Sequence, residues 1–202
     1  MKLIVSLTSP FARKVRIVLV EKNISYDLIV DVPWNADTNV PKFNPLGKVP
    51  VLLRDGGDTL FDSRVIVEFL EDYKPWPMLV PADTEGRIAV KKWEALADGV
   101  SDAAVAIFLE RLRPPAQRNP EWIVRQYSKI ENGLATMNTM ISGRFCMGEM
   151  YTLADIAVGS CLGYLDLRFS DGAWRERFPE LARLAAELAI RPSFQETAPP
   201  PA

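Results

Sequence analysis

The side chains that could do chemistry in this chain are few, because its 202 residues include no histidine and only two cysteines. Without imidazole there is no Ser-His-Asp or Cys-His nucleophile pair, no histidine general base and no histidine-containing zinc site. Cys146 and Cys161 form no Cys-x-x-Cys pair, so neither a disulfide framework nor a dithiol redox centre is indicated. The phosphate-binding motifs GxGxxG and GxxxxGK[ST] are absent as well. We therefore predict no metal site, and a reducing cytoplasm as the compartment.

The first feature that could carry chemistry is Ser9, which follows a short apolar run and precedes Pro10. A serine before a proline is typical of a helix start, with Ser9 as N-cap and Pro10 at the first helical position. The unsatisfied N–H groups and the dipole at such an end favour an anion. An ordinary helix cap is the alternative interpretation.

The second feature is the sequence Lys48-Val49-Pro50 ahead of a further apolar run. A proline is tolerated at the start of a strand or on an edge strand. A cis bond between Val49 and Pro50 would turn the Val49 N–H and C=O away from the sheet, toward the backbone of a ligand. Taken alone, this segment is only a loop.

The third feature is the pair Asp62-Ser63 at the entrance to another helix. Ser63 suits an N-cap, and the helix start suits a carboxylate. Asp62 beside it suits an ammonium group, so the pair could hold both ends of an α-amino acid group. Here too the alternative is an ordinary cap.

The elements that must position these residues form two predicted domains. Residues 1–78 alternate short apolar runs with helical patterns in the order β-α-β-loop-β-β-α, which predicts a mixed sheet with helices packed on it. A proline-rich stretch predicts a linker at residues 79–83. Residues 84–202 show only helical periodicity, including a Thr152-to-Asp155 capping box, which predicts an all-helical bundle.

Charge and hydropathy exclude two classes of partner. Lysine and arginine number 24 against 26 aspartates and glutamates, a net charge of −2, so nothing marks the chain for nucleic acid or an anionic membrane. No apolar run approaches the roughly 18 residues of a membrane helix. We therefore expect neither a nucleic-acid partner nor a membrane partner.

In combination the three features are much more specific than each is alone. The sequence from Thr8 to Leu19, the sequence from Asn44 to Leu52 and the pair Asp62-Ser63 resemble the glutathione transferase superfamily, nearest to bacterial members with a theta- or zeta-like serine. The likeness runs the whole chain. It implies a thioredoxin-like α/β N-terminal domain followed by an all-α C-terminal helical bundle.

The resemblance also implies roles for individual residues. Ser9 matches the residue whose hydroxyl hydrogen-bonds the glutathione sulfur, and Val49 matches the residue whose backbone pairs with the cysteinyl backbone. Asp62 and Ser63 match the pair that holds the γ-glutamyl group, and Lys48 is placed for the glycyl carboxylate. The weaker candidates, in or beside variable loops, are Arg64, Trp34 and Asn35.

The implied function is that of a homodimeric glutathione S-transferase, which conjugates the glutathione thiolate to a small hydrophobic electrophile. Two alternatives stay open: a glutathione-binding or interaction protein with little turnover, and a glutathione-dependent peroxidase on the same fold. Isomerase activity is disfavoured, because Ser9-Pro10-Phe11 lacks the cysteine of the zeta-type signature.

Overall fold

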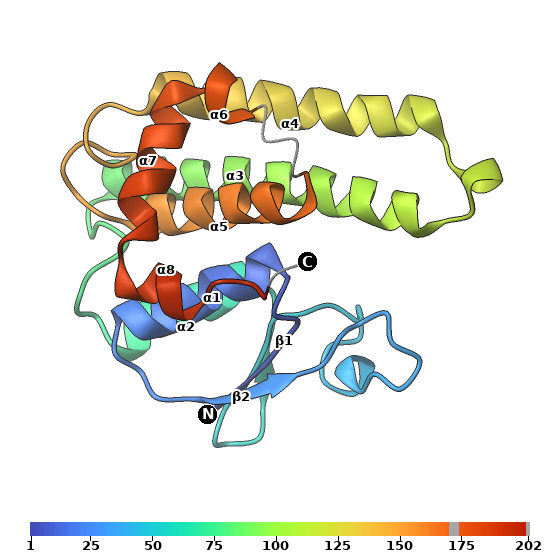
Figure 1. The fold of residues 1–202 in the computed structure, drawn as a ribbon. Helices are drawn as coiled ribbons and strands as arrows, with labels where there is room; N and C mark the ends of the chain where they lie inside the picture. Colours follow the sequence, from blue (N-terminus) through green and yellow to red (C-terminus); the bar gives the residue numbers. More distant parts are fainter. Residues whose placement is uncertain (170–173, 201–202) are drawn as a thin grey trace. The chain divides into compact units, whose positions relative to one another are not determined.

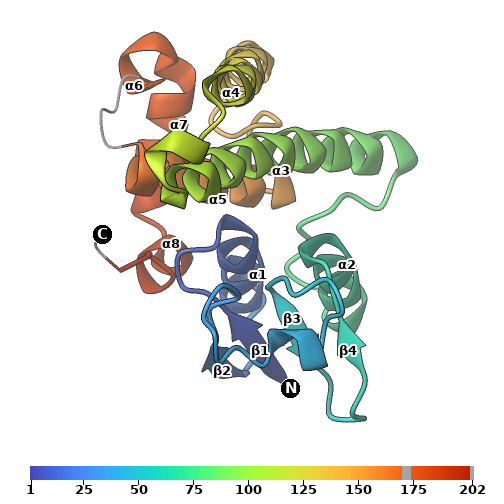
Figure 2. The same cartoon turned by 90° about the vertical axis from the view of Figure 1, so that its right-hand side faces the viewer.

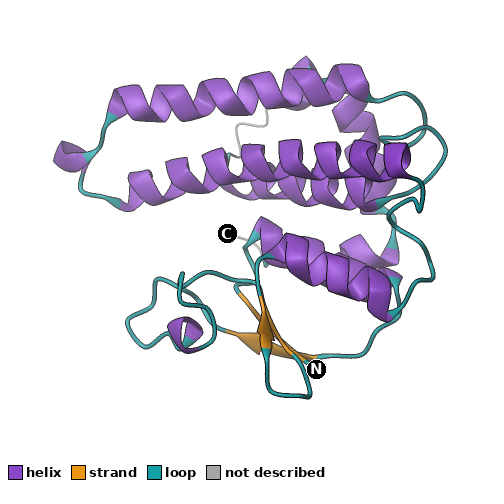
Figure 3. Cartoon of the chain, turned by 180° about the vertical axis from the view of Figure 1, so that it is seen from behind, coloured by secondary structure: helices purple, strands orange, loops and turns teal. Residues whose placement is uncertain are grey.

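The computed structural model describes residues 1–169 and 174–200. Two compact units divide the chain: Met1–Leu79 together with Arg191–Pro200, and Val80–Ile190. Strands occur only in the first unit among the described residues, and the second unit is helical (Figure 3). The predicted architecture, a thioredoxin-like α/β part followed by a helical part, is confirmed.

The sheet of the first unit has four strands in the order β2-β1-β3-β4 (Figure 2). β1 (Lys2–Val5) pairs in parallel with β2 (Asp27–Val30) and antiparallel with β3 (Val51–Leu53). β3 pairs antiparallel with β4 (Thr59–Leu60). Because one pair is parallel and two are antiparallel, the sheet is mixed, as predicted. β1 ends at Val5, because the Ser6 carbonyl accepts a hydrogen bond from the Ser9 N–H in the turn that follows the strand.

The first unit also holds the helices α1 (Pro10–Glu21) and α2 (Ser63–Tyr73) and the short 3-10 helix η1 (Val40–Lys42). The chain leaves α1 through Asn23, whose φ of 48° is the left-handed conformation expected after a helix end. The core is made by the apolar stripes of both helices and by residues of β1 and β3. Its fully buried members include Leu3, Val5, Val15, Val18, Leu19, Val51, Leu52, Ile66 and Leu70.

The C-terminal segment differs from the prediction, which assigned all of residues 84–202 to the helical domain. Pro192 begins another helix, α8 (Pro192–Glu196), and Arg191–Pro200 belongs to the first unit. Arg16 on α1 donates hydrogen bonds to the carbonyls of Glu196 and Thr197 at 3.3 Å each. Arg191 binds Glu21 at 2.9 Å. These polar contacts hold the segment on α1, and the apolar periodicity of the sequence does not report them.

The second unit consists of α3 (Thr84–Leu112), the 3-10 helix η2 (Pro115–Gln117), α4 (Pro120–Met140), α5 (Leu153–Arg168), α6 (Trp174–Arg177) and α7 (Pro179–Ala189). α3 packs against both α4 and α5 (Figure 1). The α3–α4 contact is close at Gly133, where an added Cβ would lie 2.3 Å from Cγ2 of Val100. No described helix is both long and apolar enough to span a bilayer.

The predicted capping box at the start of α5 is confirmed. The Thr152 side chain accepts the Ala154 N–H at 3.2 Å, and Asp155 accepts the Thr152 N–H at 2.8 Å. Asp155 also accepts the Cys146 N–H at 2.7 Å, which ties the preceding loop to the helix. Burial raises the pKa of the fully buried Asp155, against the lowering effect of these hydrogen bonds. Asp155 is therefore structural, as expected.

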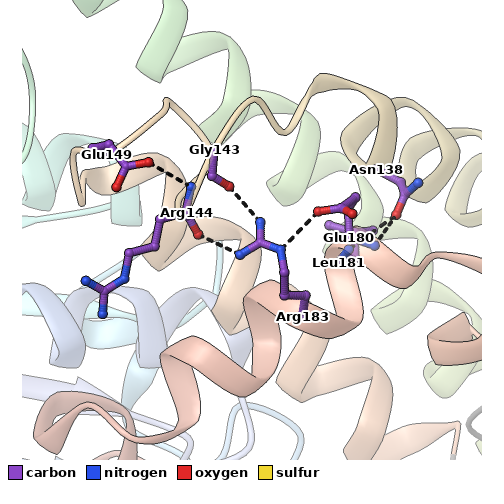
Figure 4. A network of polar contacts seen from close by, with 7 residues as sticks. All are labelled: Asn138, Gly143, Arg144, Glu149, Glu180, Leu181 and Arg183. Carbon is purple, nitrogen blue, oxygen red and sulfur yellow. Dashed lines mark hydrogen bonds and ion pairs between the residues drawn. The ribbon is translucent and has the colours of Figure 1, made fainter.

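The loop between α4 and α5 is held from the other side by α7, as Figure 4 shows. Arg183 donates hydrogen bonds to the carbonyls of Gly143 at 2.7 Å and Arg144 at 3.1 Å, and it pairs with Glu180 at 3.0 Å. The side-chain oxygen of Asn138 accepts the N–H of Glu180 at 3.0 Å. The Asn138 side chain thus satisfies the N–H groups of Glu180 and Leu181 in the first turn of α7, where Phe178 provides no side-chain cap.

Candidate functional site

The strand register brings the three sequence features to one edge of the sheet. Ile4 pairs with Val51, so continuing the β1–β3 ladder by two residues sets Ser6 opposite Val49. Leu52 pairs with Leu60, and the same extension of the β3–β4 ladder sets Pro50 opposite Asp62. Ser9 is joined to Ser6 by a turn hydrogen bond of 3.0 Å. The turns after β1, before β3 and after β4 therefore meet at a single edge.

Ser9 is the N-cap of α1, as predicted, and its side chain is half-buried. Its Oγ accepts the Ala12 N–H at 3.3 Å, while no acceptor within the described residues takes the hydroxyl proton. The first turn of α1 carries no acidic residue. Pro10 has no N–H, and Ser9 accepts the N–H groups of Ala12 and Arg13, so the Phe11 N–H is the unpaired one in this turn. The Ser9 hydroxyl proton and this N–H thus form a donor pair suited to an anion such as a thiolate.

Val49 precedes a cis peptide bond to Pro50, the geometry that turns its N–H and C=O away from the sheet. Neither the N–H nor the C=O of Val49 has a hydrogen-bond partner in the part of the chain that the structure describes. Buried or half-buried backbone groups are almost always paired, so this unpaired couple is available to an extended peptide backbone. Lys48, the preceding residue, is exposed, and its ammonium has no partner among residues 1–169 and 174–200.

Sequence reasoning gave no role to Asn44, although it lies in the same motif. Its side chain is 2% exposed. It donates to the Lys48 carbonyl at 2.8 Å and accepts the Leu46 N–H at 3.0 Å. Gly47 completes this loop with a φ of 61°, a conformation that favours glycine. Asn44 therefore holds the loop that presents Lys48 and Val49, and an Asn-Pro turn followed by glycine was the available signal.

The prediction of Ser63 as an N-cap is wrong, because Asp62 has this position. Asp62 has an extended backbone and accepts the Arg64 N–H at 3.0 Å with Oδ1, whereas Ser63 is the first helical residue. Oδ2 of the exposed Asp62 has no partner among the described residues, which leaves it available to an ammonium group. The Ser63 residue is largely buried, and no described residue hydrogen-bonds its hydroxyl. The Phe61–Asp62 peptide bond is cis, a feature that the sequence analysis did not anticipate.

The weaker candidates differ in their surroundings. Trp34 is 53% exposed in the loop after β2, and the Asn35 N–H donates to the Val32 carbonyl at 3.0 Å. This loop is held by Asp31, which accepts Thr38 Oγ1 at 2.6 Å and the Asn39 N–H at 2.9 Å. Arg64 is engaged in an interaction of its own. The clearest polar groups without a partner at the site belong to Ser9, Val49 and Asp62, and not to these three weaker candidates.

Comparison with known families agrees with this geometry. The model of the glutathione S-transferase N-terminal domain matches residues 8–73, and the model of the glutathione S-transferase C-terminal domain matches residues 120–186. The uncharacterized GST-like protein YibF of Escherichia coli (strain K12) is 40% identical over 202 residues, which is 100% of both chains.

Two solved structures are similar over almost the whole chain. A glutathione S-transferase from Methylobacillus flagellatus with glutathione bound is 46% identical, with a TM-score of 0.95, and the match covers 98% of this chain and 99% of that one. A glutathione S-transferase from Methylobacterium radiotolerans in complex with glutathione sulfonate is 44% identical, with a TM-score of 0.94 and coverage of 98% and 94%.

Proposed function

The chain belongs to the glutathione S-transferase superfamily, and from this premise we propose that it conjugates the thiolate of glutathione to a small hydrophobic electrophile. The observation that carries the proposal is the Ser9 hydroxyl proton, which has no acceptor in the described chain and lies at the N-terminal end of α1. Similar proteins with glutathione or glutathione sulfonate bound support the choice of ligand.

In this proposal, each end of the tripeptide has a complementary group on the first unit. The unpaired N–H and C=O of Val49 bind the cysteinyl backbone in the manner of an added strand. The α-carboxylate of the γ-glutamyl group binds the N-terminal end of α2 and the Ser63 hydroxyl, and its ammonium binds Asp62. Lys48 binds the glycyl carboxylate. These contacts bring the sulfur to Ser9.

The Ser9 hydroxyl donates a hydrogen bond to the sulfur, which favours the thiolate over the thiol. A free thiol with a pKa of about 8.5 is roughly 3% ionised at pH 7, and lowering the pKa to about 6.5 raises that fraction about 25-fold. With a Brønsted slope of about 0.4–0.5, the less basic sulfur loses about eightfold in nucleophilicity. The net gain at pH 7 is about threefold, so most of the acceleration must come from alignment of the two reactants.

The proposal includes a homodimer, which light scattering coupled to size-exclusion chromatography tests directly. The function itself is tested by calorimetric titration with glutathione and by assays against a panel of halogenated nitroarenes, enals and organic hydroperoxides. Binding together with conjugation supports the proposal. Binding without turnover of any electrophile would make the chain a glutathione-binding protein instead, and turnover of hydroperoxides alone would make it a peroxidase. Absence of binding would refute the assigned site.

A further inference from the structure

The outer edge of the sheet in the first unit is formed by β2, which has a neighbouring strand on one side only. β2 stands at the end of the strand order β2-β1-β3-β4 (Figure 2), and no described strand pairs with its other side. The N–H groups of Asp27 and Asp31 donate at 3.2 Å and 2.8 Å to carbonyls of residues 1–5. Because backbone groups alternate in direction along a strand, the N–H and C=O groups of Leu28 and Val30 point away from β1. β2 therefore presents an open edge to a further strand.

The side chains along this open edge are apolar and exposed. Leu28, Ile29 and Val30 are 41%, 37% and 54% exposed, whereas the β1 residues that pair with them are at most 2% exposed. Single exposed apolar residues are ordinary on a protein surface, but three in a row on an unpaired strand form a template for another strand. An extended segment binds such an edge through backbone hydrogen bonds and side-chain contacts.

Aspartates lie at both ends of the apolar row and decide which kind of strand fits. Asp27 is exposed, and its carboxylate has no partner in the described part of the chain. Asp31 accepts hydrogen bonds from Thr38 and Asn39 but forms no ion pair with a described residue. Lys2, which faces Asp27 in the β1–β2 register, makes no ion pair with it. The apolar row is thus flanked by two carboxylates whose charge no cation within residues 1–169 and 174–200 neutralises by contact.

A second copy of this chain is a poor occupant of the edge. In the symmetric antiparallel register that pairs the whole apolar row, Asp27 of one copy would lie opposite Asp31 of the other at both ends of the row. Like charges directly opposite each other destabilise a strand pair. A register shifted by two residues would instead place one of the aspartates opposite Ile29. A strand with lysine or arginine at the flanking positions would form favourable cross-strand pairs, so charge complementarity selects a basic segment.

We propose that the outer edge of β2 is a docking site for an extended segment of a partner protein, with lysine or arginine opposite Asp27 and Asp31 and β-branched residues between them. The segment joins the sheet antiparallel to β2 and exchanges backbone hydrogen bonds with Leu28 and Val30. Its basic side chains pair with the two aspartates. The interaction requires neither glutathione nor the proposed transferase reaction, so the two proposals stand or fall separately.

The probe is a cyclic β-hairpin whose outer strand reads Ser-Lys-Val-Thr-Val-Lys-Ser, because a preformed strand loses little conformational entropy on binding. One control hairpin carries N-methyl groups on both valines, and a second has glutamate in place of both lysines. Nuclear magnetic resonance titration of the full chain measures the affinities. The N-methylated hairpin should bind about tenfold or more weakly, since two backbone hydrogen bonds are lost. The glutamate hairpin should bind about fivefold or more weakly at low salt, and this difference should shrink at about 1 M salt.

Hydrogen exchange of the wild-type chain locates the bound hairpin without any variant. The outward amides of Leu28 and Val30 should exchange rapidly in the free chain, whereas the Ile29 amide points toward β1 and is protected. Saturating hairpin should slow exchange at Leu28 and Val30 by about tenfold or more. Binding that protects neither amide, or equal affinity for the three hairpins, would overturn the proposal. Protection that rises with chain concentration in the absence of hairpin would assign the edge to a second copy and would overturn it as well.

A pair of variants separates backbone pairing from side-chain contact. Leu28→Pro removes one outward N–H and no bond to β1, a substitution that an edge strand tolerates. Leu28→Thr is the matched control, because it shortens the same side chain and keeps the N–H. We expect Leu28→Pro to weaken hairpin binding about tenfold and Leu28→Thr to weaken it less than about threefold. Equal weakening by both would attribute the affinity to the side chain alone and contradict strand addition.

Discussion

Replacing Ser9 tests the proposed chemistry most directly, because the residue has two separable roles. Its Oγ caps α1 through the Ala12 N–H, and loss of such a cap costs about 1 kcal/mol when alanine replaces serine but only a few tenths with glycine. Ser9→Gly therefore removes the hydroxyl with little loss of helix stability. Ser9→Thr keeps both the hydroxyl and the cap. Ser128→Ala, on the exposed surface of α4, is a matched control.

The expected effect lies in the pH profile of kcat rather than in its value at one pH. If Ser9 lowers the thiol pKa from about 8.5 to about 6.5, the thiolate fraction at pH 7 is roughly 76% in the wild type and 3% in Ser9→Gly. The more basic sulfur of the variant gains about eightfold in nucleophilicity once ionised. The ratio of wild-type to variant kcat is then about 3 at pH 7 and about 0.16 at pH 9, which is a fall of about 20-fold.

Loss of alignment multiplies the variant rate by a constant and leaves this 20-fold change of ratio intact. The rate is followed through the absorbance of the dinitrophenyl conjugate at saturating glutathione. The thiolate absorbance of the binary complex, titrated against pH, gives the thiol pKa separately. A Ser9→Gly variant that folds, binds glutathione and keeps the wild-type thiol pKa would refute the assigned role of Ser9.

Three further predictions concern the framework around the site. Gly133→Ala should lower the free energy of unfolding by about 1–3 kcal/mol, because its Cβ would meet Val100 at 2.3 Å. Gly99→Ala on α3 adds a Cβ that meets no atom within 4 Å, so it should raise the free energy of unfolding by up to about 1 kcal/mol. Urea denaturation of both variants measures these changes. Asn44→Ala removes two hydrogen bonds of the loop before Val49 and should weaken glutathione binding about tenfold by calorimetry, whereas an unchanged affinity would show that the loop needs no such support. Burial raises the pKa of Asp155 above its unfolded value, so its proton is held more tightly in the folded chain. The stability that this proton contributes is present below the ordinary aspartate pKa and is lost as the pH rises through the folded pKa. The difference in unfolding free energy between the wild type and Asp155→Asn should therefore become smaller from pH 4 to pH 7. A difference that grows with pH would contradict this account.

Local signals in the sequence were sufficient for the fold class and for the starts of α1 and α5. Ser9 before Pro10 and the Thr152-to-Asp155 box act within one helical turn, so neighbouring residues alone identify them. Val15, Val18 and Leu19, which recur with helical periodicity on α1, are likewise fully buried. These features depend on bonds between residues that are close in the chain, and they need no knowledge of its other parts.

The sequence predicted that α2 begins at Asp62-Ser63, but it assigned the N-cap to Ser63 and not to Asp62. Both Asp62 and Ser63 have side-chain oxygens that can cap a helix, so composition does not separate them. The backbone decides, because Asp62 is extended and Ser63 is helical. The hairpin of β3 and β4 ends just before Asp62, and α2 packs against α1, which lies far back in the chain, so contacts outside the pair itself set these dihedral angles.

Three properties of this protein were decided by its tertiary structure alone. The pairing of β1 with β3 and of β3 with β4 brings Ser9, Val49 and Asp62 to one edge of the sheet, although they are separated by tens of residues. Hydrogen bonds from Arg16 to the carbonyls of Glu196 and Thr197 place the C-terminal segment with the first unit. The contact of Arg168 with Phe108 joins two helices. Long-range contacts of this kind form only after loops have closed, and their energies depend on which surfaces meet, so a periodic pattern along the chain cannot encode them by itself.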